Sequence, residues 1–311
     1  MKKVTFLIVS FAYSFSFSQQ QVGNGDMELW DNVGQSSEEP SNWNSFKTGQ
    51  GSFASFASQQ VQRSTAIRTG ATGQYCVRVW SKSTLGIVAN GNLTLGKINM
   101  GSSTPSDPAN YNFSQTADAN FSEALTTTPD SIVFWVKYTS ANASDSARVH
   151  AIIHDSYDLR DPIDANSLPH VVASAELNYS RTSGSWVRKS VPFVYVPGSP
   201  APTPAFILLT FTTNKTPGGG SANDEVLVDD IELIYNSTIG VETIDNQKEI
   251  SAYYSTETGL VLNGGSNFLS IITMEGKVTC QGSIDQLNGT KLNTGIYFIQ
   301  SANSAIKILV P

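Results

Sequence analysis

The sequence has little charge, only two cysteines, and no long apolar run beyond its first residues. Only 14% of its 311 residues are charged, and the formal net charge is −7. An acidic chain lacks the basic surface of nucleic-acid binding proteins and is repelled by anionic membrane surfaces. The two cysteines, Cys76 and Cys280, have no clustered ligands as a zinc site would need. We expect two unpaired thiols that lie in different domains.

The longest apolar stretch covers residues 4–17 and is too short for a permanent membrane-spanning helix. Lys2 and Lys3 precede it, and small residues, Ser16 and Ser18, follow at the spacing of a cleavage site. We therefore predict a signal peptide over residues 1–18, cleaved after Ser18. The mature protein should be secreted or displayed on the outer cell surface, without a transmembrane segment.

Short alternating segments dominate residues 19–236, and no stretch of twelve or more residues shows a helical period. Apolar and polar residues alternate in the segments 74–80, 131–138 and 148–154, whereas 206–211 is almost continuously apolar. Short strands separated by Gly, Pro and Asn are typical of antiparallel sandwiches. The sequence predicts an all-β protein whose main domain is a jelly-roll β-sandwich.

Two segments are candidates for the strands that open and close this sandwich. Residues 24–30 alternate, with Met27 and Leu29 facing a core, and residues 226–235 alternate in the same way. We expect them to be the first and last strands and to close the sandwich together.

The end of the chain has a different organisation. Residues 237–249 are polar and without pattern, which predicts a linker. Residues 250–311 contain five or more short apolar segments, which predict a small Ig-like β-sandwich.

The tail carries the segment Lys291-Leu292-Asn293-Thr294-Gly295-Ile296-Tyr297-Phe298-Ile299, preceded by Gly276-Lys277-Val278. In these residues it resembles the C-terminal sorting domain of the type IX secretion system, although the Asn-Pro usual near the start of that domain is absent. The resemblance implies that residues 250–311 are a secretion sorting domain whose partner is the type IX secretion machinery.

The main domain carries Asn24-Gly25-Asp26-Met27-Glu28-Leu29-Trp30, Pro40-Ser41-Asn42-Trp43 and Leu227-Val228-Asp229-Asp230-Ile231-Glu232-Leu233. It resembles in these motifs the carbohydrate-metabolism domain family known as PCMD, which is found in secreted bacterial proteins. The resemblance implies a jelly-roll sandwich that is connected to glycans.

Carboxylates on the two proposed closing strands are candidate calcium ligands. Calcium takes six to eight oxygen ligands, and carboxylates from separate strands can supply several of them. Sandwich carbohydrate-binding modules with similar opening and closing motifs often hold a structural calcium there. We expect Glu28 and Asp229 as ligands, with Asp26 and Asp230 as further candidates; the alternative is that these acids are solvated charges that protect sheet edges.

Aromatic residues are the candidate ligand-binding side chains, because sugar faces stack on flat rings. Phe53, Phe56, Tyr111 and Tyr157 lie in polar loops, and Trp135 lies in a strand. The alternative for Trp135 is a place in the core.

No residue pattern identifies a catalytic site. A glycosidase needs two carboxyls at a defined separation, and no spacing in the sequence marks such a pair. His150 and His154 fall on one strand about 13 Å apart, too far to share a metal ion, and we expect them to be surface or edge residues. The leading hypothesis is a non-catalytic glycan-binding protein. The alternatives are a glycan-active enzyme of the glycoside hydrolase type and a structural adhesin that binds a protein partner.

Overall fold

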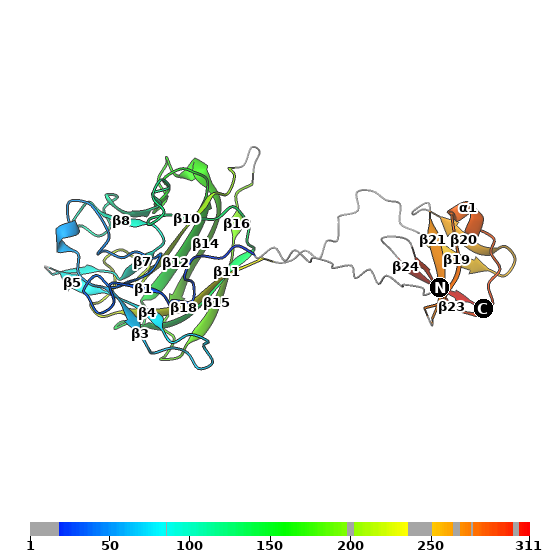
Figure 1. The fold of residues 1–311 in the computed structure, drawn as a ribbon, viewed down its shortest axis with the longest axis horizontal. Helices are drawn as coiled ribbons and strands as arrows, with labels where there is room; N and C mark the ends of the chain where they lie inside the picture. Colours follow the sequence, from blue (N-terminus) through cyan, green and yellow to red (C-terminus); the bar gives the residue numbers. More distant parts are fainter. Residues whose placement is uncertain are drawn as a thin grey trace, which may run out of the picture. The chain divides into compact units, whose positions relative to one another are not determined.

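The computed structural model describes residues 19–84, 86–197, 202–235, 251–263, 268–274, 276–300 and 305–311. These residues are nearly all in strands or loops, which confirms the all-β prediction. They form two compact units, one ending at residue 236 and one beginning at 237, each with its own apolar core (Figure 1). The predicted signal peptide and linker lie outside the described residues. No helix in the described part of the chain is long and apolar enough to cross a membrane.

The main unit is a sandwich of two antiparallel sheets, which we call the first and the second sheet. The first sheet has the strand order β10 (Glu123–Ala124), β17 (Phe206–Thr212), β12 (Ser146–His154), β14 (Val171–Ser180) and β16 (Val194–Tyr195), and β7 (Asn92–Thr94) also pairs with β17. The second sheet has the order β15 (Val187–Pro192), β11 (Ser131–Thr139), β18 (Glu225–Ile234), β4 (Cys76–Trp80) and β3 (Val61–Ser64).

The core of the main unit is formed by alternate side chains of the facing strands. Phe134 on β11 meets Phe211 on β17 edge to face, with ring centroids 5.2 Å apart. Both rings are fully buried, so truncating either to Ala should cost about 3–5 kcal/mol of stability. The other face of each sheet is thereby left for loops and ligands, because successive side chains of a strand point in opposite directions.

Smaller elements cover the outside of the sandwich. A three-stranded sheet joins β13 (Arg160–Asp161), β9 (Asn110–Phe113) and β8 (Lys97–Met100), and two short pairs join β1 (Trp30–Asp31) to β2 (Glu39–Pro40) and β5 (Lys82–Thr84) to β6 (Ile87–Ala89). The 3₁₀ turns are η1 (Ala54–Phe56) and η2 (Leu168–His170).

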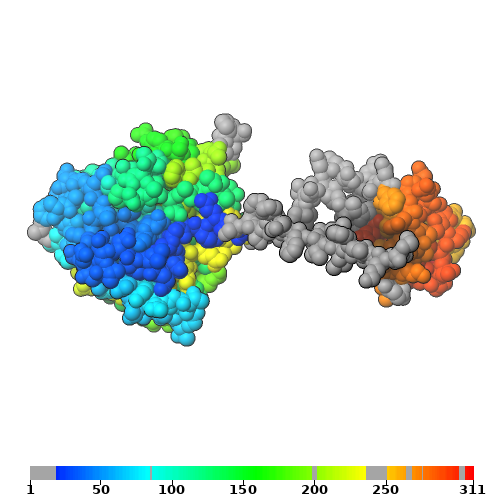
Figure 2. Space-filling view, viewed as in Figure 1, coloured from blue at the N-terminus to red at the C-terminus, as the bar shows by residue number. Residues whose placement is uncertain are grey.

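The segment 24–30 is not the opening strand that its alternation suggested. Met27 is buried but has a left-handed φ of +55°, and Leu29 is 63% exposed instead of facing the core. The chain turns here, so only Trp30 belongs to a strand. In Figure 2 the N-terminal part of the main unit, in dark blue, covers part of the face that is turned to the viewer.

The segment 226–235 does form a strand, β18, but β18 is not an edge strand. It lies in the middle of the second sheet, between β11 and β4. The N-terminal segment reaches it by other contacts: the backbone N–H of Ile231 donates to the carbonyl of Gly25 at 2.8 Å, and the Gln21 amide bonds both backbone groups of Leu233. The two segments are therefore neighbours without closing the sandwich as paired strands.

The second unit has a two-stranded and a four-stranded sheet. The pair is β19 (Ser251–Ser255) and β20 (Gly259–Asn263), and the larger sheet has the order β22 (Val278–Gly282), β21 (Leu269–Thr273), β23 (Gly295–Gln300) and β24 (Ala305–Val310). One short helix, α1 (Ile284–Leu287), begins with a capping box between Ser283 and Gln286. Cys280 lies in this unit and Cys76 in the other, and both are free thiols as expected.

Candidate functional site

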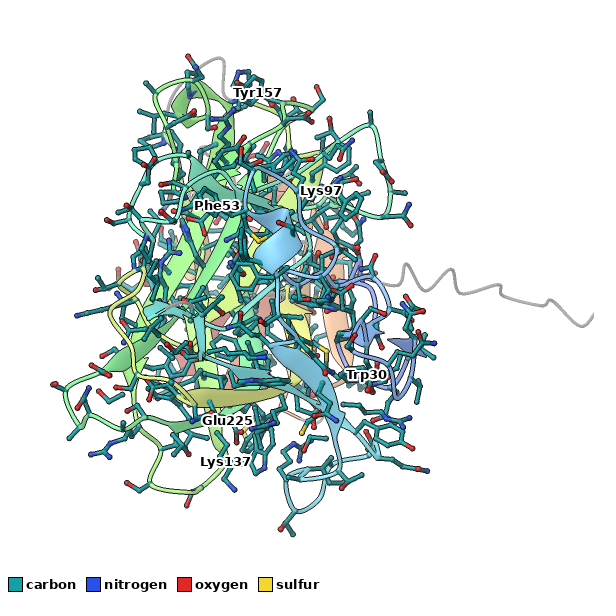
Figure 3. The ribbon with its side chains drawn as sticks, turned by 90° about the vertical axis from the view of Figure 1, so that its left-hand side faces the viewer. Trp30, Phe53, Lys97, Lys137, Tyr157 and Glu225 are labelled. Atoms are coloured by element: carbon teal, nitrogen blue, oxygen red, sulfur yellow. The ribbon has the colours of Figure 1, made fainter. Side chains whose placement is uncertain are left out.

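A pocket of about 450 Å³ lies on the outer face of the first sheet. Arg148 of β12, Thr212 of β17 and Asn92 of β7 form its floor, because their alternation turns them away from the core. The walls come from the loops that cover this face, which carry η1 and β5, β6, β8 and β9. Figure 3 shows η1, near the Phe53 label, in front of the strands of the sandwich.

One wall of the pocket is apolar and aromatic. Phe53, which directly precedes η1, and Phe56, its last residue, have ring centroids 6.1 Å apart, and Phe56 is 51% exposed. The turn is anchored to β8, since the backbone N–H of Phe53 donates to the carbonyl of Met100 at 3.0 Å. Gly51 makes this approach possible: its φ is +105°, and a Cβ there would lie 2.4 Å from the Met100 carbonyl oxygen.

Tyr111 of β9 also lines the pocket. Its ring meets Phe113 edge to face at 5.6 Å, and the guanidinium of Arg160 lies 4.1 Å from the ring centroid. The structure thus brings together three of the predicted ligand-binding residues, Phe53, Phe56 and Tyr111.

A charged cluster closes one end of the floor. Arg148 donates to both carboxylate oxygens of Asp161 at 3.1 and 3.0 Å, and its Nε donates to Glu176 at 2.8 Å. The ring Nδ1 of His150 lies 3.0 Å from Asp161. Burial alone would raise the pKa of Asp161, but the hydrogen bonds and charges of His150 and Arg148 hold that pKa well below its usual range.

The rest of the floor is rich in side-chain amides. Asn90 lies beside β7, where its Nδ2 donates to the carbonyls of Asn214 at 3.3 Å and Thr216 at 2.8 Å. Asn92 donates to Asn112 Oδ1 at 2.9 Å. Planar amides opposite aromatic rings can bind hydroxyl groups while the rings pack on apolar faces.

Tyr157 is not part of this pocket. Its ring stacks on His170 with centroids 4.0 Å apart and planes 6° apart, and Asp155 bonds the ring Nδ1 of that histidine at 2.8 Å. In Figure 3 Tyr157 lies near the upper end of the main unit, well away from Phe53.

Trp135 is not in this pocket either. It lines a second, charged cleft of about 320 Å³ on the outer face of β11 and β18, together with Asp26, Arg68, Arg188 and Asp230. The guanidinium of Arg68 lies 4.7 Å from the Trp135 ring centroid, and its Nε donates to Asp230 at 2.8 Å. A sugar could reach that face of the ring only if Arg68 moved.

Of the four proposed calcium ligands, Asp26 and Asp230 line this same cleft, and Asp229 precedes Asp230 in β18. Glu28 accepts from the backbone N–H groups of Gln74 and Tyr75, both at 2.8 Å, and Asp230 is paired with Arg68. Burial, and next the charge of Asp230, raise the pKa of Asp229 to about 7. No group of three acidic, His or Cys side chains in the described ranges is arranged to hold a metal ion. The calcium site stays a prediction.

The two histidines of β12 are not surface or edge residues, which corrects the expectation from the sequence. β12 lies between β17 and β14, so His150 is 6% exposed and His154 is fully buried. His154 Nε2 is 2.8 Å from the hydroxyl of Ser114, and its Nδ1 is 2.8 Å from the carbonyl of Asp155. Loops cover this part of the outer face. The alternation of a strand does not predict whether its outward-facing side chains are buried under loops.

Several residues of the pocket were not singled out from the sequence: Arg148, Asp161, Asn90 and Asn92. Alternation along β12 places Arg148 and His150 on the same face of the strand, so the sequence pattern indicates that the two side chains are neighbours. The sequence gives no comparable signal for Asp161, whose position depends on the pairing of β13 with β9.

No protein-family model matches this chain, and no curated protein matches its sequence. Its fold is similar to that of a protein from Bacteroides thetaiotaomicron VPI-5482, provisionally described as a glycoside hydrolase, with a TM-score of 0.53 and 18% identity over 71% of this chain and 72% of that chain. A second protein with the same provisional description, from Bacteroides vulgatus ATCC 8482, has a TM-score of 0.47 and 19% identity over 66% of this chain and 89% of that one. The first likeness shows a shared fold alone, and the second is too weak to support a conclusion.

Proposed function

We propose that this protein is a non-catalytic glycan-binding protein and that the pocket on the first sheet holds the sugar. The observation that carries the proposal is the convergence in one pocket of Phe53 and Phe56, from the turn at η1, and Tyr111, from β9, beside a floor of amides. Aromatic rings bury the apolar face of a pyranose, while amides and backbone groups pair with its hydroxyls. The provisional description of the similar fold concerns glycans and supports the same choice of ligand.

The charged cluster supports binding over catalysis at this pocket. A glycosidase needs one carboxyl that is protonated before it donates to the leaving group. Asp161 is the acid that lines the pocket among the described residues, and its low pKa keeps it ionised. Glu176 is committed to the same arginine. Neither group is therefore suited to act as the general acid.

The proposal includes export of the protein to the outer cell surface or the medium. Its supports are the charged and apolar residues at 1–18, and the Gly295-Ile296-Tyr297 segment in the tail that resembles a type IX sorting domain. The second unit would then serve transport, and the main unit would carry the ligand.

Isothermal titration of the purified protein with a panel of oligosaccharides tests the binding proposal. We expect dissociation constants in the millimolar to micromolar range, about −4 to −8 kcal/mol, without release of reducing sugar. Phe53→Ala and Phe56→Ala should each weaken binding at least several-fold. Tyr157→Ala, an aromatic loop residue outside the pocket, is the matched control and should leave binding unchanged.

Two results would contradict the proposal. Steady release of reducing sugar, abolished by replacing one carboxylate, would identify a glycan-active enzyme instead. A protein that binds no member of the panel but captures a protein ligand would favour the structural adhesin.

A further inference from the structure

Two acceptor atoms at the floor of the pocket have no hydrogen-bond partner in the described chain. They are Oδ1 of Asn90 and Oδ1 of Asn92, and both are shielded from bulk solvent. Since a buried acceptor without a partner costs free energy, most such atoms in proteins are paired. Both residues line the pocket, so a donor that enters it is the group best placed to reach them.

The orientation of the Asn90 amide is fixed by its surroundings. Its Nδ2 points at two carbonyl oxygens, those of Asn214 and Thr216, and exchanging the two ends of the amide would place an oxygen against these carbonyls. Its Oδ1 is therefore a permanent acceptor. Asn92 Nδ2 donates to the side-chain amide oxygen of Asn112 at 2.9 Å, which leaves Oδ1 as the unpaired end of the Asn92 amide.

The floor offers acceptors but no uncommitted cation. All three guanidinium nitrogens of Arg148 already donate to Asp161 or Glu176. Lys215, at the rim, is exposed and makes no ion pair with any residue that the structure describes. An anionic sugar would thus find a positive charge only at the mouth of the pocket.

We propose that Asn90 and Asn92 determine specificity, by accepting hydrogen bonds from two hydroxyl groups of a neutral sugar packed against Phe53 and Phe56. This inference rests on the proposed glycan function and names the ligand class: an uncharged sugar with free hydroxyls at the positions that face β7. Sugars that are deoxygenated or O-methylated at either position lack the donor and should bind less tightly.

The experiment uses the full chain and titrates neutral oligosaccharides of glucose, mannose, galactose and xylose, with oligogalacturonate as the anionic probe. The best neutral binder is then compared with its monodeoxy analogues. In the wild-type protein, removal of a hydroxyl that faces Asn90 or Asn92 should weaken binding about tenfold, as expected for one hydrogen bond to a buried acceptor. In Asn90→Leu or Asn92→Leu the parent sugar and its deoxy analogue should bind equally.

The ratio of the dissociation constants of the deoxy sugar and the parent sugar separates recognition from a structural effect. A distorted pocket would weaken the binding of both sugars and leave this ratio unchanged. Asn99→Leu is the control in the same pocket: its Nδ2 donates to the Ala109 carbonyl at 2.8 Å and its Oδ1 accepts from Gln50 at 3.3 Å. That variant should keep the wild-type ratio. Lys215→Gln should not change the binding of the neutral sugar.

Three outcomes would overturn the inference while the proposed function stands: deoxy analogues that bind as tightly as the parent, Asn variants that keep the ratio, or a preference for oligogalacturonate that Lys215→Gln abolishes. The proposed function fails separately, if no sugar binds or if Phe53→Ala and Phe56→Ala bind like the wild type.

Discussion

Asp161 accepts hydrogen bonds from both terminal nitrogens of Arg148, and only 1% of its side chain is exposed. The two residues lie on different sheets, because Arg148 belongs to β12 and Asp161 to β13. β13 pairs with β9, which carries Tyr111 into the pocket. This ion pair therefore fixes one wall of the pocket to its floor.

Replacing Asp161 by Asn should destabilise the main unit strongly. The substitution leaves Arg148 partly buried with only the more exposed Glu176 as a charged partner, and breaking a buried pair typically costs about 3–5 kcal/mol. Urea denaturation at neutral pH measures the loss. Glu176→Gln is the control, since its side chain is 46% exposed and its loss should cost about 1 kcal/mol or less. If both variants lost the same free energy of unfolding, burial of the Arg148–Asp161 pair would not contribute to stability.

The buried His154 should make stability fall in mild acid. Burial lowers the pKa of His154 to about 4, whereas an unfolded histidine has a pKa of about 6.5. Protonation therefore favours the unfolded chain: stability is greatest above pH 6.5 and falls as the pH drops from 6.5 to 4, by about 3 kcal/mol in total.

Urea denaturation at pH 7 and at pH 4.5 tests this prediction. Asp229, whose pKa is raised to about 7, contributes in the opposite sense over the same range, so each variant is compared with the wild type. Relative to the wild type, His154→Gln should shift the difference between the two pH values toward greater stability in acid, while the half-buried His170, replaced in the same way, should leave that difference unchanged. If the His154 variant retains the full acid sensitivity, another group is responsible.

Calcium, if it binds near Glu28 and Asp229, should stabilise the main unit. A ligand that binds only the folded state contributes about 2.7 kcal/mol at a hundredfold excess over its Kd. Added chelator should then lower the melting temperature by several degrees, and Glu28→Gln should remove this response. Glu257→Gln, in the second unit, is the control. A melting temperature that chelator does not change would contradict calcium binding at these residues.

Deleting residues 250–311 should block export beyond the periplasm, if the tail acts as a sorting domain. The main unit should still fold, because its core contains no residue of the second unit. Cell fractionation locates the truncated protein, and circular dichroism of purified material checks its fold. Normal amounts of the truncated protein at the surface or in the medium would contradict the sorting role.

The sequence predicted the fold class well because strand alternation is a local signal. The segments 131–138, 148–154 and 206–211 all lie in strands of the sandwich. Local pattern failed at residues 24–30, where Asn24 and Met27 adopt left-handed turns although their neighbours alternate. It also failed for His154, because burial there depends on loops that fold over the outer face of the sheet.

The candidate site was only partly predictable for the same reason. Aromatic residues in polar loops led to Phe53, Phe56 and Tyr111, which do meet in one pocket. The same reasoning led to Tyr157, which stacks on a neighbouring histidine instead. Which loops converge depends on the pairing of β8, β9 and β13, and composition carries no information about that pairing.

The division of the pocket between strands and loops bears on how such a protein can change over evolutionary time. Its floor belongs to strands whose opposite side chains build the core, but the ring-bearing wall stands on the short turn η1, held to β8 mainly through backbone bonds. Mutations that exchange Phe53 or Phe56 therefore leave both the core and the anchoring bonds intact. If the pocket binds a sugar as proposed, single substitutions at these two positions could change the sugar preference at little cost in stability.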